Sequence, residues 1–344
     1  MAISTALFNS SSVISKEITV VPSFFFLIFS FVPERSNNTV EIVYNGTTAT
    51  VTIASNISNY VTLESGTSSH VVLVQDSTFA GVDATSSNSN GEIIYVLSGT
   101  STNGSFYMEG SYKATVNLNG VTLTNPSGPA IAIMNGKRIE VSVKSGTTNS
   151  LTDGENADYN GCFHCKGHTK LKGKGTLNVV GNSKHAVYSK EYIEVKNLTL
   201  NITAAQKDAI HCKEYFLMES GTVKITGVTD DGIQVELDGT TSTGTTTGHE
   251  DEDSGNFYMT GGTLSISGYG GKAIKTDGTI TYSGGTQNFD TTDTTETATA
   301  IGQVVSNTPA DSACYDLMGR QTNAARPGLY IFKNGNTTVK KIVR

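Results

Sequence analysis

Acidic side chains cluster in short turns between apolar, strand-like segments of this sequence. Asp208 stands in one such turn, and Asp230 and Asp231 stand together in the next one, up to 23 residues later. Asp favours turns, which accounts for any single one of these residues. Carboxylates on neighbouring turns repel one another, however, unless another group offsets their charge. Ca²⁺ suits this role because it takes about six to eight oxygen ligands. We therefore predict bound Ca²⁺, and the candidate ligands are Asp153, Asp208, Asp230 and Asp231.

Two further columns of side chains recur at fixed positions of the strand-like segments. The first contains His164, Tyr188, His211, Gln234 and Lys275, and the second, two residues later, begins with Lys166, Lys190 and Lys213. The charges of three lysines in one row repel one another. A sequence retains such a row where an anion binds to it, or where nothing selects against it. Lys is also common on exposed strands, which is the alternative interpretation. We take these columns as a candidate ligand-binding face.

The elements that must position these side chains repeat with a period of 23 residues. Thr176, Thr199 and Thr222 are spaced at this interval, and after an insertion the pattern resumes at Thr263, 41 residues beyond Thr222. Short alternating strands with such a period are typical of a solenoid. Stacked coils lie about 4.8 Å apart, so equivalent positions form columns, and Phe163, Val187, Ile210, Ile233 and Ile274 form an inward apolar one. The sequence predicts an all-β parallel β-helix with coils of about 23 residues.

Composition agrees with this fold and excludes one class of partner. The chain has 344 residues with 36 Gly, and its charged fraction is only 16%. Lys and Arg number 24 against 31 Asp and Glu, which gives a net charge of −7. Nucleic-acid binding needs a basic surface, so we expect no nucleic-acid partner. We also expect a monomer.

The cysteines invite a zinc interpretation that the strand pattern opposes. Cys162 and Cys165 form a C-x-x-C motif close to His164 and His168, and these are zinc-ligand types. Alternation along a strand places Cys165 and His164 on opposite faces. Cys165 and Cys212 lie two coils apart, roughly 9–10 Å at the spacing of stacked strands, which is too far for a disulfide. We interpret these cysteines as core residues.

Both ends of the chain differ from its middle. An apolar run from Ile18 to Pro33 has about the length of a signal peptide, although no basic segment precedes it and no small-residue cleavage site follows it. We expect a signal-like or poorly ordered segment over 1–35, a β-helix over 36–289, a Thr-rich linker over 290–311 and a small β domain over 312–344.

The C-terminal segment carries the motifs "YDLMGR", "GLYIF" and "KKIVR" in that order. Together they resemble the C-terminal sorting domain that Bacteroidetes use for type IX secretion. This resemblance covers about thirty residues. It implies that the type IX machinery is a partner and that the protein is secreted or held at the cell surface, associated with the outer membrane.

The body carries six motifs that point to one family. They are "LTDG" from Leu151, "KGKGTLNVVGN" from Lys172, "KDAIHCKEY" from Lys207, "DDGIQVE" from Asp230, "GHEDEDSGNFYMTGGTLSISG" from Gly248 and "GKAIKTDG" from Gly271. From about residue 110 to 285 the chain resembles secreted carbohydrate-binding domain proteins built as right-handed parallel β-helices with a pectate-lyase-like fold. The resemblance implies binding of cellulose and acidic pectin, with Ca²⁺ held by Asp208, Asp230 and Asp231. The chain departs from the pattern at Gly161 and His185, which stand where later turns carry Asp.

The sequence is compatible with three functions, each from a different class of protein. The first is a non-catalytic module in which His164, Tyr188 and His211 make ring contacts with a polysaccharide, and the lysines, including Lys275, bind uronate carboxylates. The second is a cell-surface adhesin or structural spacer. The third is a polysaccharide lyase, which needs a cation and a base. The body offers Lys213 or Lys275 as a base, but its one arginine is Arg138. We expect binding without catalysis.

Overall fold

The computed structural model describes residues 16–20, 37–64, 69–82, 89–155, 158–239, 252–290, 313–315, 321–322, 328–334 and 337–343. The chain divides into two compact units, Met1–Val304 and Val305–Arg344. The apolar run after Val20 and the Thr-rich segment predicted as a linker lie outside the described residues.

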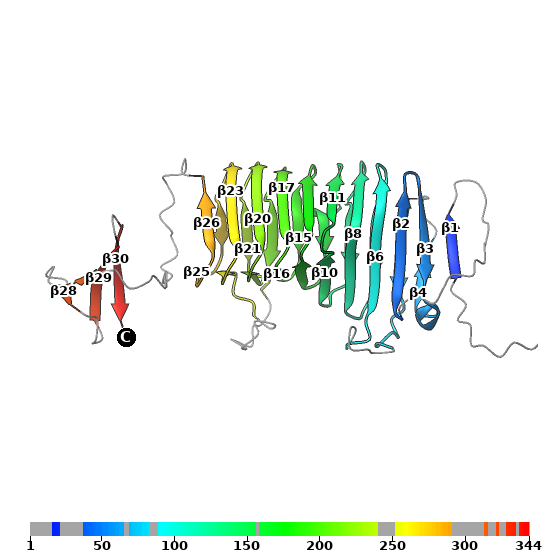
Figure 1. Cartoon of the computed structure of the whole chain (residues 1–344), viewed down its shortest axis with the longest axis horizontal. Coiled ribbons are helices and arrows are strands. Elements are labelled where there is room, and N and C mark those ends of the chain that lie inside the picture. Colours follow the sequence, from blue (N-terminus) through cyan, green and yellow to red (C-terminus); the bar gives the residue numbers. More distant parts are fainter. Residues whose placement is uncertain are drawn as a thin grey trace, which may run out of the picture. The chain divides into compact units, whose positions relative to one another are not determined.

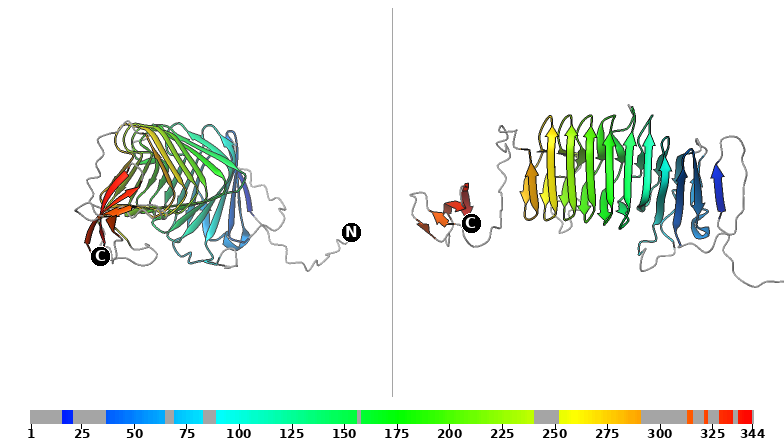
Figure 2. Two further views of the ribbon diagram at one scale, coloured as in Figure 1. Left: turned by 60° about the vertical axis from the view of Figure 1, so that its left-hand side comes forward. Right: turned by 45° about the horizontal axis from the view of Figure 1, so that its top comes forward.

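The first unit is a parallel β-helix, as the sequence predicted, and its strands lie side by side in successive coils (Figures 1 and 2). One side of each coil contributes to a nine-stranded sheet, called here the first sheet. Its strands are β4 (Val61–Leu63), β5 (His70–Gln75), β7 (Ser105–Glu109), β9 (Ile131–Met134), β12 (Gly161–Cys165), β15 (His185–Ser189), β18 (Ile210–Lys213), β21 (Ile233–Glu236) and β24 (Ile274–Thr276).

The other two sides of the coils belong to a second, 17-stranded sheet. Two long strands, β6 (Ile93–Ser101) and β8 (Ala114–Asn125), run along both of these sides, and β8 pairs with β10 through its first half and with β11 through its second. One series continues with β10 (Ile139–Val143), β13 (Thr169–Gly173), β16 (Ile193–Lys196), β19 (Tyr215–Met218), β22 (Asn256–Met259) and β25 (Ile280–Tyr282). The other continues with β11 (Thr148–Asp153), β14 (Thr176–Gly181), β17 (Thr199–Ala205), β20 (Thr222–Val228), β23 (Thr263–Tyr269) and β26 (Thr286–Phe289).

The register between coils confirms the 23-residue period. Thr176 pairs with Thr199, and Thr222 pairs with both Thr199 and Thr263. The insertion between β21 and β22 therefore leaves the pairing of the coils on either side of it in register. This holds because parallel pairing needs only the strands to be in register, and the connection between them can lengthen at little cost.

The interior contains columns of apolar side chains, as predicted. The column Phe163, Val187, Ile210, Ile233 and Ile274 is buried throughout. In the neighbouring series Phe216 pairs with Phe257, and their rings stack with centroids 5.1 Å apart and an interplanar angle of 7°. Stacked identical positions thus give one continuous core along the helix axis.

Antiparallel strands close the N-terminal end of the β-helix. The strands are β1 (Lys16–Val20), β2 (Thr39–Asn45) and β3 (Thr48–Ile53), followed by the short 3₁₀ turn η1 (Ser55–Ile57). β3 pairs antiparallel with both β1 and β2, while β2 pairs parallel with β6. Gly46, in the tight β2–β3 turn, has a φ of +69°, a conformation that glycine adopts without strain.

The second unit is a four-stranded antiparallel sheet in the order β28-β27-β29-β30. Its strands are β27 (Ala313–Tyr315), β28 (Gln321–Thr322), β29 (Gly328–Asn334) and β30 (Thr337–Val343). The segment predicted as a small C-terminal β domain is thus a sheet of its own. Within the described ranges of both units, no helix is long and apolar enough to cross a membrane.

Candidate functional site

The first sheet carries a ladder of aromatic rings on the side opposite to its inward column. His164 pairs with Tyr188, and Tyr188 pairs with His211, so the predicted column exists. We call these three residues the ring ladder. The Tyr188 ring stacks on that of His164 at 5.0 Å and on that of His211 at 5.6 Å. Coil stacking therefore brings the rings face to face.

This stacking changes what the ring ladder can offer a ligand. The three residues are only 8–9% exposed, although the sequence led us to expect outward, accessible rings. Because the ring faces pack on one another, mainly ring edges reach solvent. Burial, followed by the nearby Lys184, lowers the pKa of His164 to about 4, so this rung is neutral at physiological pH.

The lysine column divides into two exposed members and one paired member. Lys166 and Lys190 are exposed and follow β12 and β15. Nζ of Lys213 lies 3.2 Å from Oδ1 of Asp238, and Nζ of Lys275 lies 3.3 Å from Oδ2 of Asp231. The sequence predicted all four as contacts for a uronate, but in this structure Lys213 and Lys275 already have carboxylate partners.

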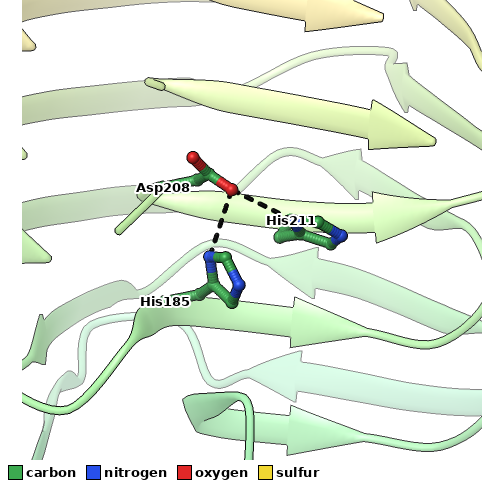
Figure 3. Close-up of side chains that lie close together, drawn as sticks. All are labelled: His185, Asp208 and His211. Carbon is green, nitrogen blue, oxygen red and sulfur yellow. Dashed lines mark hydrogen bonds and ion pairs between the residues drawn. The ribbon is translucent and has the colours of Figure 1, made fainter. Parts of the chain in front are cut away.

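The turn before β18 brings two histidines onto one carboxylate (Figure 3). Nδ1 of His211 lies 3.0 Å from Oδ2 of Asp208, and Nδ1 of His185, on the preceding coil, lies 3.2 Å from the same oxygen. Oδ1 of Asp208 accepts a hydrogen bond from the backbone N–H of Asp231. Burial favours the neutral carboxyl, but the two histidines outweigh it and lower the pKa of Asp208.

The predicted acidic cluster also forms. One carboxylate oxygen from each of Asp208, Asp230 and Asp231 lies within 4.8 Å of the others, and we call this set the acidic turn cluster. Gly271 makes room for it, because a Cβ there would stand 2.4 Å from Oδ1 of Asp231 and 2.7 Å from Oδ1 of Asp230. The oxygen-rich donor set and this reserved space fit Ca²⁺.

Part of the charge in the acidic turn cluster is already offset by the protein. Asp231 accepts a hydrogen bond from the backbone N–H of Lys272 and pairs with Lys275. Burial nevertheless raises the pKa of Asp231 above its ordinary value, against the lowering effects of Lys272 and Lys275. Repulsion among the carboxylates of this cluster is therefore a weaker argument for a bound cation than the sequence suggested.

Asp153 belongs to none of the clusters of potential metal ligands found among the described residues. It ends β11 and accepts a hydrogen bond from the backbone N–H of Asn182 on the next coil. Its side chain is buried, and burial raises the pKa of Asp153 to about 6 despite that hydrogen bond. The structure thus gives this predicted calcium ligand the geometry of a turn-stabilising residue.

The cysteines whose side chains the structure describes lie in the core, as predicted. Cys162, Cys165 and Cys212 are buried free thiols. Cys165 packs in the hydrophobic core, whereas His164 belongs to the ring ladder. Cys314 lies in β27, where side chains are outside the described part of the structure.

A second cluster, which our sequence reasoning missed, lies at the other end of the first-sheet strands. Nε2 of His168 lies 3.3 Å from a carboxylate oxygen of Glu214 and 3.9 Å from one of Glu191. Burial, and then the neighbouring Glu214, raise the pKa of Glu191 to about 8. These residues are spaced 23 apart, so the same period that revealed the core columns could have revealed them.

Comparisons with known proteins point to one family and one fold. A family model described as "Carbohydrate-binding domain-containing protein" matches residues 81–318. Among solved structures, the polysaccharide lyase-like protein from C. thermocellum, studied as a gadolinium derivative, is similar with a TM-score of 0.51 and 18% sequence identity. That match covers 72% of this chain and 99% of the other, and at this identity it supports the fold alone. A search of curated proteins found no match.

Proposed function

The chain belongs to the family of carbohydrate-binding domain-containing proteins, and from this premise we propose that it binds an acidic plant cell-wall polysaccharide, without cleaving it, on the outer side of the first sheet. The observation that carries the proposal is the ring ladder with its flanking lysines. Aromatic rings and lysines recur on three successive coils at the spacing of stacked strands, about 4.8 Å. A long, rigid surface of this kind suits a repetitive polymer.

The chemistry of this surface favours an acidic chain. Lys166 and Lys190 are exposed beside the ring ladder and supply ammonium donors for uronate carboxylates. The edge of Tyr188 supplies contacts for sugar hydroxyls and C–H groups. A neutral polymer such as cellulose would use the ring edges but not the lysines.

Calcium is the cofactor that we propose for the acidic turn cluster. Asp230 and Asp231 would hold the ion together with Asp208, and Gly271 leaves room for their carboxylates. A bound Ca²⁺ supplies a fixed positive charge that can also accept oxygens from the polysaccharide. The protein groups would orient the ion at the end of the first-sheet strands, next to the ring ladder.

One assay on the full chain distinguishes binding of the polysaccharide from its cleavage. The protein is incubated with polygalacturonate, with Ca²⁺ or with EDTA, while absorbance is followed at the band of unsaturated uronates, and co-sedimentation is then measured. Calcium-dependent binding without an absorbance increase is the expected result. A rising absorbance would establish a lyase, and absence of binding to both pectate and cellulose would favour the adhesin or spacer.

The lysines next to the ring ladder give a prediction on selectivity. Lys166→Ala combined with Lys190→Ala should weaken pectate binding by about 2- to 30-fold, because exposed ion pairs contribute roughly 0.2–1 kcal/mol each. Cellulose binding should be nearly unchanged. The effect on pectate should shrink in about 1 M salt, which screens exposed charges. Affinity electrophoresis in pectate gels measures both quantities.

The control for this prediction removes the same charge from other sides of the β-helix. Lys174→Ala combined with Lys224→Ala changes two exposed lysines and should leave pectate binding unaltered. Equal loss of pectate and cellulose binding in the ladder variant, or equal loss of pectate binding in both variants, would contradict the electrostatic part of the proposal.

Export is the other expectation that we carry forward as a proposal. The second unit, with its "YDLMGR" and "KKIVR" motifs, would direct the protein through type IX secretion to the cell surface or the medium. In a Bacteroidetes host, removal of residues 312–344 should retain the protein inside the outer membrane, as fractionation and immunoblotting would show. Undiminished surface exposure of the shortened chain would refute this role.

A further inference from the structure

We infer that His185, Asp208 and His211 form a binding site for a divalent transition metal of the zinc class, which shares Asp208 with the acidic turn cluster but takes its other ligands from the two histidines. The three side chains converge on one point (Figure 3), and Oδ2 of Asp208 lies 3.2 Å from Nδ1 of His185 and 3.0 Å from Nδ1 of His211. Neighbouring ligands of a tetrahedral zinc ion stand roughly 3.3–3.6 Å apart, given zinc–ligand distances of about 2.0–2.2 Å. A small outward relaxation would therefore admit the ion.

An unsatisfied nitrogen points into this site. His185 is 7% exposed, and its Nδ1 lies 3.2 Å from Oδ2 of Asp208 without making a well-aligned hydrogen bond to any described residue. His211 Nδ1 makes the better aligned contact with the same oxygen. A buried polar atom without a hydrogen bond carries a desolvation cost, and coordination of a metal ion would remove it.

The outer partner of His211 matches the arrangement found around metal-bound imidazoles. Nε2 of His211, the nitrogen that faces away from the site, lies 3.4 Å from Oε2 of Glu236 on the next coil. Metal-ligating histidines usually donate a hydrogen bond from their second ring N–H to a carboxylate, a backbone carbonyl or water, which orients the ring and raises its basicity. Glu236 is therefore a positioning residue in this site.

The donor set selects the class of metal. Two imidazole nitrogens with one carboxylate suit Zn²⁺ and its transition-metal neighbours, whereas Ca²⁺ takes oxygen ligands. His185 stands in the column that carries Asp208 and Asp231 on the next two coils. Replacement of an acidic position by histidine thus changes an oxygen site into a nitrogen-rich one. The three protein ligands leave a fourth position for water or a ligand group.

Metal titration of the tag-free, EDTA-treated full chain tests this site. Zn²⁺ added in calorimetry should bind at one such site per chain. His185→Gln and His211→Gln should each weaken Zn²⁺ binding by more than about 100-fold, beyond the roughly 10- to 100-fold loss seen when a residue that hydrogen-bonds a metal ligand is replaced. Glu236→Gln should fall within that range. His70→Gln is the matched control, because His70 lies in the same sheet and contacts Ser105 and Asn103, and it should bind Zn²⁺ as the unaltered chain does.

Two additional measurements distinguish the failure of this proposal from that of the calcium proposal. Ca²⁺ titration should respond to Asp230→Asn but not to His185→Gln. X-ray absorption of the Zn²⁺-loaded unaltered chain needs no variant and should show two imidazoles with oxygen neighbours at about 2.0–2.2 Å. Two spectroscopic results would overturn the inference: sulfur neighbours around the metal, or a shell made only of oxygen. It would also be overturned by undiminished Zn²⁺ binding in the histidine variants or by a folded chain that binds no Zn²⁺.

Discussion

Replacing Phe216 with alanine should lower the free energy of unfolding by about 3–5 kcal/mol. The ring is fully buried between coils and stacks on Phe257. Its removal leaves a cavity that the stacked strands cannot close, because backbone hydrogen bonds between coils hold them in register. Urea denaturation of the full chain, followed by circular dichroism, measures the change.

The matched control is Phe289→Ala in β26. Phe289 is only partly buried, and β26 is the last strand of its series, so the expected loss is no more than about 2 kcal/mol. Hydrogen exchange adds spatial detail, because solenoid coils interact mainly with their neighbours. Amides of β16, β19 and β22 should lose protection first in the Phe216 variant. Equal destabilisation by both substitutions would contradict the view that inter-coil packing at Phe216 stabilises the helix.

Replacing Asp153 with asparagine should stabilise the protein at pH 8 by up to about 3 kcal/mol and should have little effect at pH 3. Burial raises the folded-state pKa of Asp153 to about 6, above its ordinary value of 3.8. Folding therefore favours the protonated carboxyl, and the stability associated with this group is full below pH 3.8 and is lost as the pH rises through about 6. Asparagine keeps an oxygen for the N–H of Asn182 and removes the charge.

Thermal and urea unfolding at pH 3, 5 and 8, in EDTA, measure this pH dependence. Asp153→Ala is the control, because it removes the acceptor as well as the charge and should destabilise at pH 3 by about 1–3 kcal/mol. A loss of stability in Asp153→Asn at pH 8 would mean that the buried carboxylate itself is needed. The same measurements repeated with Ca²⁺ in place of EDTA would restore Asp153 as a metal ligand if Ca²⁺ stabilised the unaltered chain but not Asp153→Asn.

Much of the fold could be predicted from residue spacing. The 23-residue period placed Val187, Ile210 and Ile233 in one inward column and resumed correctly at Thr263 after the insertion. It succeeded because side chains of a strand alternate between two faces, and parallel coils in register repeat that alternation. The same logic brought Asp208 and Asp231 onto adjacent coils.

The partners of individual polar side chains could not be predicted in this way. The spacing placed His164, Tyr188 and His211 in a column, but whether their rings stack or point into solvent depends on rotamers and on the coils on either side. Lys213 turns to Asp238 and Lys275 turns to Asp231, which spacing does not determine. The contact between His185, Asp208 and His211 joins a turn, the strand that follows it and the preceding coil.

Hydrophobic periodicity therefore specified the β-helix and its register, because burial of apolar columns is a collective effect repeated on every coil. The candidate sites depend on single contacts of about 3 Å, which arise only when side chains from different coils choose their partners. That difference explains why the position of Asp208 followed from the sequence, whereas its two histidine neighbours became evident in the folded chain.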